Sequence, residues 1–319
     1  MIEYVAKRGD IMGLYLSKKI KIYSPKVSSK LVIYHDSDWH VGIDSDMKRM
    51  YQLQEEVERI QPDFRLISGD ILDDAEARNT KNGKEVLNLL QRSEEVCPTI
   101  VSMGNHDNAH KVGKGELDWE YSFDPDWYRK IEEVTSSHLV KYNDIYEGNV
   151  WLDDQIEIVV MNPPYEHYFE KEEAKKDFLA YYQKKDLHFK TGKDHFHILV
   201  LHTPAVAPDL VQELPILKEA DIVTSGHMHA GIVPPYVRPF MNVFKSHWGL
   251  RSPNNQLLWN AKYCWGKISK DDTDFIVNPG VTKIGPEKKG LLQSLNNVLP
   301  NESYCIEVHP EEKQKVLSR

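Results

Sequence analysis

The sequence predicts an α/β fold in which helices pack on the faces of a sheet. Short apolar runs rich in β-branched residues recur along the chain and end in polar residues, as buried strands do. Longer stretches with helical periodicity separate these runs, so strands and helices alternate. The chain has 319 residues, of which 40% are hydrophobic, and this is enough for a sizeable core. Because no repeat or low-complexity tract interrupts it, we expect a single domain over residues 1–319.

The expected elements follow one another in a regular order from residue 31 onward. Strands are predicted over residues 31–34, 64–67, 99–101, 156–160, 197–201 and 221–224. Helices are predicted over residues 44–60, 83–96, 124–134, 171–185 and 208–218. Residues 1–30 are expected to be an N-terminal extension that joins the sheet. Residues 232–276 have no clear period and are expected to form a long loop excursion near the active site, because ligands bind beyond the carboxyl ends of strands in such sheets.

Charge and composition narrow the class of protein. The formal net charge is −9 and the basic runs are short, which disfavours a protein that coats nucleic acid. No segment approaches the roughly 20 apolar residues of a membrane span, and the first ten residues do not resemble a signal peptide, so a cytoplasmic protein is expected. The three cysteines (Cys97, Cys264 and Cys305) are too scattered for a disulfide framework.

Polar clusters follow nearly every predicted strand. The clusters are Asp38-Trp39-His40, Gly69-Asp70-Ile71-Leu72-Asp73, Gly104-Asn105-His106-Asp107, Leu201-His202-Thr203 and Gly226-His227-Met228-His229. They supply carboxylate and amide oxygens and imidazole nitrogens without a thiolate, a set that suits Mn, Fe or Zn ions. Asp38 and His40 can reach one ion together if the chain between them is extended, because alternate side chains of a strand point the same way. The carboxyl ends of neighbouring strands meet in one crevice, so we expect the clusters to form one site.

The order of these clusters resembles the calcineurin-like metallophosphoesterase superfamily, in which the motifs are D-x-H, G-D-x-x-D, G-N-H-[DE], H and G-H-x-H. The resemblance extends from Asp38 to His229, and every motif position is filled. It implies a four-layer α/β/β/α sandwich of the bacterial dinuclear type, with two packed mixed sheets flanked by helices. It also implies a phosphohydrolase that cleaves phosphomonoesters, phosphodiesters or pyrophosphates with a hydroxide held by two transition-metal ions (Mn, Fe or Zn).

The resemblance also assigns roles to individual residues. One ion would be held by Asp38, His40 and His229, the other by Asn105, His202 and His227, and Asp70 would bridge the two. His106 would protonate the leaving oxygen and Asp73 would orient its imidazole. Asp107 is interpreted as a structural residue that holds the turn.

One departure from the family pattern bears on the substrate. Members that act on phosphoproteins continue the second motif with Arg-Gly, and this chain has Asp74-Ala75 instead. A small phosphoester or nucleotide-like substrate is therefore expected, and no nucleic-acid partner. Tyr165, His167 and Arg251 are candidate substrate contacts, and the turn at 278–280 matches an N-P-G turn that closes the core sheet in several bacterial members.

Other interpretations of the sequence remain open. Asn162-Pro163-Pro164-Tyr165 copies a methyltransferase signature, but no glycine-rich loop for a methyl donor follows a strand, so a strand-exit turn is expected there. His195 and His197 are expected at a solvated strand start. The aromatic residues of 232–276 could pack the excursion onto the core or line a lid, and basic residues there could bind phosphate: Arg238, Lys245 and His247. A nuclease of the same fold and a catalytically silent scaffold are the alternative functions.

Overall fold

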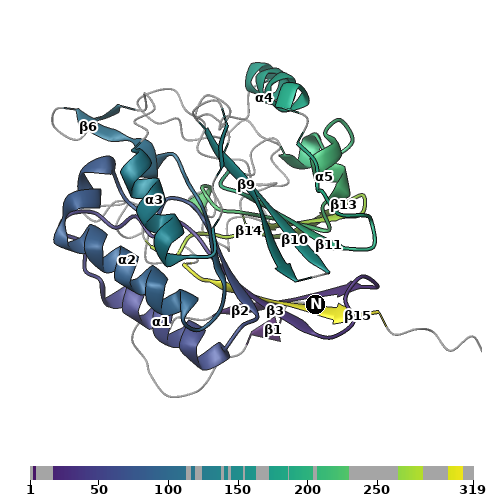
Figure 1. Cartoon of the computed structure of the whole chain (residues 1–319), viewed down its shortest axis with the longest axis horizontal. Coiled ribbons are helices and arrows are strands. Elements are labelled where there is room, and N and C mark those ends of the chain that lie inside the picture. Colours follow the sequence, from purple (N-terminus) through teal and green to yellow (C-terminus); the bar gives the residue numbers. More distant parts are fainter. Residues whose placement is uncertain are drawn as a thin grey trace, which may run out of the picture.

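Two β-sheets lie face to face at the centre of the protein, with helices on their outer sides (Figure 1). The computed structural model describes residues 3–4, 17–112, 116–118, 124–137, 140–142, 145–153, 155–162, 172–185, 187–203, 207–229, 265–282 and 301–311. Both sheets mix parallel and antiparallel strands. This arrangement confirms the predicted α/β/β/α sandwich.

The first sheet has six strands in the order β1-β2-β15-β3-β4-β5. They are β1 (Glu3–Tyr4), β2 (Lys18–Ser24), β15 (Tyr304–Pro310), β3 (Leu31–Asp36), β4 (Phe64–Ser68) and β5 (Thr99–Ser102). Strands β3, β4 and β5 run parallel, so their carboxyl ends lie at the same edge. The C-terminal strand β15, which no sequence pattern predicted, inserts parallel to β2 and antiparallel to β3.

Three helices cover the outer face of the first sheet: α1 (Lys48–Ile60), α2 (Lys81–Glu94) and α3 (Pro125–Val134) (Figure 1). Local capping explains where two of them begin. The Thr80 hydroxyl accepts a hydrogen bond from the backbone N–H of Gly83 at the start of α2. The Asp124 carboxylate caps α3, and Pro125 occupies its first turn, where its missing N–H costs nothing.

The second sheet has seven strands in the order β13-β14-β12-β11-β10-β9-β8. They are β13 (Gly266–Lys270), β14 (Thr273–Val277), β12 (Ile222–Ser225), β11 (Phe196–Leu201), β10 (Ile156–Met161), β9 (Ile145–Asp153) and β8 (Val140–Tyr142). Strands β10, β11, β12 and β14 run parallel. The helices α4 (Glu172–Lys185) and α5 (Pro215–Glu219) pack on its outer face. A two-stranded hairpin, β6 (His110–Val112) and β7 (Glu116–Asp118), lies apart from both sheets.

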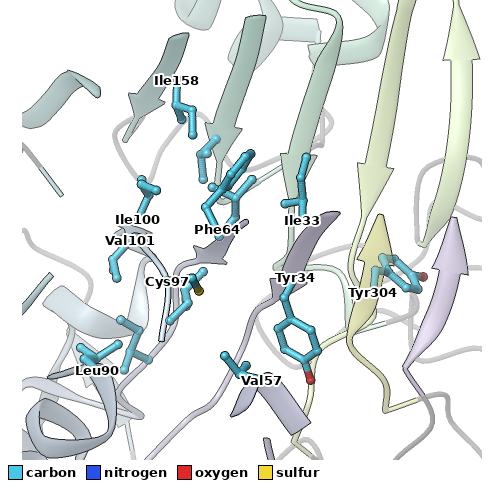
Figure 2. Close-up of a cluster of buried hydrophobic side chains, with 14 of the residues drawn as sticks. Ile33, Tyr34, Val57, Phe64, Leu90, Cys97, Ile100, Val101, Ile158 and Tyr304 are labelled. Atoms are coloured by element: carbon cyan, nitrogen blue, oxygen red, sulfur yellow. The ribbon is translucent and has the colours of Figure 1, made fainter. Parts of the chain in front are cut away.

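The period-two alternation of buried strands divides the core. Ile158 and Val160 of β10 face the first sheet, whereas Val159 and Met161 face the helices of the second. Figure 2 shows side chains of the first cluster from both sheets, with Ile158 above a group from the first sheet. Cys97 and Cys305 are buried free thiols. Both faces of the second sheet are therefore covered, as its continuous apolar strands require.

The six predicted strands agree with the structure to within two residues at each end. The predicted helix over 208–218 is wrong in its first half, which forms a 3-10 turn (Ala207–Asp209) and a loop before α5. Pro215 is the reason, because it keeps the preceding residue extended and then starts the helix. Residues 232–264 of the predicted loop lie outside the described residues. Its last part needs correction, because β13 pairs there with β14, which continues to Val277, as an antiparallel hairpin.

Among the described residues, no helix combines the length and the apolar composition that crossing a membrane requires.

Candidate metal centre

Loops from both sheets converge at the carboxyl ends of β3, β4, β5, β11 and β12. They carry the seven predicted metal ligands: Asp38, His40, Asp70, Asn105, His202, His227 and His229. The potential ligand atoms of Asp38, His40 and His229 lie within 4.8 Å of one another, and so do those of Asp70, His202 and His227. His227 and His229 therefore belong to different groups, although only one residue separates them.

The first group is built around two facing imidazoles. His40 Nε2 and His229 Nε2 are 3.0 Å apart, and Asp38 Oδ1 lies 3.4 Å from His229 Nε2. The Asp38 carboxylate is fully buried and accepts hydrogen bonds from the backbone N–H of His227. His229 Nδ1 is buried and has no hydrogen-bond partner among the described residues. Two nitrogens and a carboxylate oxygen thus point at one position, which suits a first-row transition-metal ion.

The second group centres on Asp70 and His202. Ser68 O accepts the Nδ1–H of His202 at 2.5 Å, so His202 directs Nε2 toward Asp70 Oδ2, 3.1 Å away. Two acceptor atoms at that distance fit together well when a cation lies between them. The buried Asn105 Oδ1 likewise has no hydrogen-bond partner among the described residues.

Asp70 lies between the two groups. Its Oδ2 atom is 3.1 Å from His202 Nε2 of the second group and 3.7 Å from His40 Nε2 of the first. Its Oδ1 atom accepts a hydrogen bond from the backbone N–H of His106. This placement fits the predicted bridging role, and the donor set of both groups fits a pair of ions.

The backbone at the site is unusual. Five of the seven candidate ligands have a left-handed backbone conformation, with φ values of 58° (Asp38), 46° (His40), 52° (Asp70), 66° (His227) and 42° (His229). Non-glycine residues rarely adopt this region, and such residues cluster at functional sites. The expectation that Asp38 and His40 lie on an extended chain is therefore wrong. They face the same group because the loop turns between them.

Two glycines allow the motif loops to approach closely. A Cβ atom on Gly226 would lie 1.7 Å from Ser37 Oγ and 2.5 Å from Asp38 Oδ2. A Cβ atom on Gly104 would lie 2.2 Å from Asp70 Oδ1 and 2.5 Å from the backbone nitrogen of Asp70. Neither position can hold a side chain while both loops stay in place.

The pKa values of the candidate ligands depend on burial and on the neighbouring charges. Burial opposes ionisation of Asp38, but His229 and His40 outweigh it and lower the pKa of this carboxyl. Burial also lowers the pKa of His227 to about 3 and that of His229 to about 4. At neutral pH His227 and His229 therefore present free nitrogen lone pairs near the ionised Asp38 carboxylate. Burial also opposes the charged forms of His40 and His202, but the neighbouring carboxylates raise the pKa of His40 and raise that of His202 to about 9, so a cation bound there would displace a proton.

His106 and Asp73 lie beside the first group. His106 Nδ1 is 2.8 Å from the backbone carbonyl of Asp73 and 3.9 Å from its carboxylate Oδ1. The ring of His106 meets the ring of His40 edge to face, with centroids 4.5 Å apart. His106 is therefore placed at the rim of the centre, next to a candidate ligand.

Asp107 joins the second and third motifs. Its Oδ1 atom accepts from the backbone N–H of Leu72 and its Oδ2 atom accepts from that of Gly104. This confirms the structural role predicted for Asp107. The carboxyl group of Asp74 is buried and caps the 3-10 helix at Ala75–Asn79 by accepting from Ala77 N, so it supports the fold and does not replace the missing arginine.

Several supporting residues carry no sequence signal of their own. The turn at 278–282 crosses from the second sheet to the first, where Thr282 Oγ1 donates to Asp38 O at 2.8 Å. Gly280 packs against Asp38 and His229 with a φ of 88°. Ser37 Oγ donates to the Asp38 carboxylate. Of these residues, only Gly280 carried a signal in the sequence, because it belongs to the N-P-G turn.

The remaining candidates divide into two sets. Asn162 is buried and accepts a hydrogen bond from the backbone N–H of Met103, so it links the ends of β10 and β5, and the rest of the predicted turn (163–165) lies outside the described residues. His197 is buried and stacks on Phe189, so the expectation of a solvated strand start is wrong for this residue. The other candidates lie outside the described residues: Tyr165, His167, Arg238, Lys245, His247 and Arg251.

Comparison with solved structures finds several phosphatases. A dimetal phosphatase from Danio rerio is 12% identical, with a TM-score of 0.42 and coverage of 78% of this chain and 87% of that one. A purple acid phosphatase from yellow lupin (Lupinus luteus) seeds is 10% identical, with a TM-score of 0.39 and coverage of 92% and 56%. A phosphopantetheinyl hydrolase from Mycobacterium tuberculosis is 12% identical, with a TM-score of 0.37 and coverage of 79% and 89%.

The family is shown by a sequence match. The model of the calcineurin-like phosphoesterase family matches residues 31–231, which is more than half of the chain. That range begins at β3 and extends just past the last candidate ligand, and it contains all five motifs that carry the candidate metal ligands. The chain belongs to the calcineurin-like phosphoesterase family and is a metal-dependent phosphoester hydrolase.

Proposed function

We propose that the protein hydrolyses small phosphomonoesters, phosphodiesters or pyrophosphates at a centre that holds two transition-metal ions. The observation that carries this proposal is the position of the Asp70 carboxylate, whose Oδ2 atom lies 3.7 Å from His40 Nε2 of the first group and 3.1 Å from His202 Nε2 of the second. Asp38, His40 and His229 would hold one ion, and Asn105, His202 and His227 the other. When bound, such ions supply a water of lowered pKa and positive charge for the phosphoryl oxygens.

The residues of this chain would then orient the substrate and move one proton. His106 donates its Nδ1–H to the carbonyl of Asp73, so Nε2 is the atom that would carry a proton to the leaving oxygen. The side chain of His106 is 21% exposed, so a substrate can reach it. His106 is therefore proposed as the general acid and not as a ligand.

The substrate is proposed to be a small ester because the chain lacks the arginine of phosphoprotein phosphatases. Asp74 occupies that position and its carboxyl group is buried in a helix cap. Without that arginine the site offers a phosphoprotein little binding energy beyond the metal ions. A small ester can be bound and activated by the ions alone. The net charge of −9 also argues against the alternative function of a nuclease.

The test is a hydrolysis assay on protein freed of metal and then supplied with Mn²⁺, Fe²⁺ or Zn²⁺. We expect turnover of bis-p-nitrophenyl phosphate or p-nitrophenyl phosphate only with metal, two ions per chain, and loss of both ions in Asp70→Ala. Asp46→Asn is the matched control, because Asp46 is an exposed residue six positions after His40 whose carboxylate accepts a hydrogen bond from the backbone N–H of Lys48. Faster cleavage of single- or double-stranded DNA would favour the nuclease. A protein that binds two ions but cleaves nothing would favour the scaffold.

A further inference from the structure

We propose that the carboxylate of Asp73 positions the candidate ligand His40, while Asp73 supports His106 through its backbone carbonyl. Asp73 is then a positioning residue for the metal centre. This inference rests on the proposed function, because it takes His40 to hold an ion. It assigns the two functional groups of one residue to two different imidazoles.

Both imidazoles lie within ion-pair distance of the Asp73 carboxylate, and the hydrogen bond from His106 to the backbone carbonyl separates their roles. Asp73 Oδ1 is 3.6 Å from His40 Nδ1 and 3.9 Å from His106 Nδ1. The hydrogen bond of His106 Nδ1 goes instead to the backbone carbonyl of Asp73, at 2.8 Å. A carbonyl oxygen accepts only, so His106 donates this proton, and its Nδ1 has no second proton for the carboxylate.

The geometry of His40 requires a partner of this kind. Its Nε2 atom faces the other members of the first group, 3.0 Å from His229 Nε2 and 3.8 Å from Asp38 Oδ1. Nε2 must carry the lone pair to bind an ion, so Nδ1 carries the proton and turns toward Asp73. Histidine ligands commonly donate this second N–H to a carboxylate, which fixes the ring and makes it a better ligand.

The backbone holds Asp73 in this place. His40 N donates to Asp70 O at 2.9 Å, and Asp73 N donates to Val41 O at 3.2 Å. A parallel bridge between Val41 and Leu72 completes the contact between the first and second motif loops. The carboxylate of Asp73 is consequently aligned with His40 by main-chain bonds, which a change of the Asp73 side chain leaves in place.

The experiment compares metal affinity with leaving-group dependence in Asp73→Asn. We expect the dissociation constant for Mn²⁺, measured by titration of the metal-free protein, to rise about 10- to 100-fold. The rate should recover when Mn²⁺ is raised to saturation, and its dependence on leaving-group pKa should match the wild type, because the carbonyl that holds His106 is unchanged. Asp73→Glu, which keeps the charge, should recover part of the affinity.

Two controls make the outcome decisive. Asp46→Asn removes an equal charge from an exposed position and should leave Mn²⁺ affinity unchanged. His106→Ala should keep its ions and should not be rescued by added Mn²⁺. The inference is overturned if Asp73→Asn binds Mn²⁺ as tightly as the wild type and shows the leaving-group dependence of His106→Ala. A wild-type protein that binds no ion would instead refute the proposed function, which is a separate result.

Discussion

Gly104→Ala should disable the metal centre although alanine adds only one methyl group. The new Cβ atom would lie 2.2 Å from Asp70 Oδ1, 2.5 Å from Asp70 N and 2.8 Å from Asp70 Cγ. Ordinary contacts begin at 3.4 Å, and the nitrogen belongs to the main chain and cannot rotate away. The loops that carry Asp70 and Asn105 must therefore separate by about 1 Å, a displacement that can reduce catalysis about 100-fold.

Gly42→Ala is the matched control for this variant. Gly42 lies two residues after His40, but a Cβ atom there would meet its nearest neighbours at 3.5 Å or more, which is an ordinary contact. Neither Gly104 nor Gly42 has a positive φ, so the comparison isolates the steric effect. We expect Gly42→Ala to keep both ions and a rate near that of the wild type.

The measurements are metal content by elemental analysis, hydrolysis of bis-p-nitrophenyl phosphate and the free energy of unfolding. Gly104→Ala should bind less than two ions per chain, lose about 100-fold in rate and lose about 1–3 kcal/mol of stability from overpacking. Two tightly bound ions and a wild-type rate in Gly104→Ala would refute the reasoning. The close approach of the two loops would then not be needed for the centre.

Three further results are expected. His106→Ala should keep both ions and lose about 10²- to 10⁴-fold in kcat. The loss should be largest for alkoxide leaving groups and smallest for p-nitrophenolate, which needs little protonation. An equal loss across esters of graded leaving-group pKa would argue against a general acid. Small phosphoesters should be cleaved with a kcat/KM at least about tenfold above that for a phosphopeptide, equivalent to about 1.4 kcal/mol, and the reverse order in a side-by-side assay would contradict the substrate proposal. Glu307→Gln should lower the free energy of unfolding at pH 7, because burial would raise the pKa of Glu307 but Lys30 and Lys19 lower it to about 2. This stabilisation is present above the unfolded pKa of 4.5 and is lost as pH falls toward 2. Denaturant titrations should therefore show a difference between wild type and variant of about 1 kcal/mol at pH 7 that vanishes near pH 2. The difference is small because both lysines are partly exposed to solvent.

The sequence by itself determined the strands, the motif clusters and their order. The run that forms β10 is buried along its whole length, and its β-branched composition is a local property that needs no knowledge of partners. Polar residues directly after such strands must meet at one edge of a parallel sheet, which is why Asp38, Asp70 and Asn105 could be grouped before any coordinates were known. The structural role of Asp107 followed from its place in a motif.

Only the tertiary structure decided how these residues face one another. The left-handed backbone of Asp38 and His40 depends on hydrogen bonds to the neighbouring loop, such as that from His40 N to Asp70 O, and no local pattern encodes it. Strand β15 enters the first sheet between β2 and β3 because pairing with residues far away in the chain selects its position. The two proposed roles of Asp73 also depend on tertiary structure, because its carboxylate faces His40 and its backbone carbonyl binds His106 only after residues distant in the sequence come together.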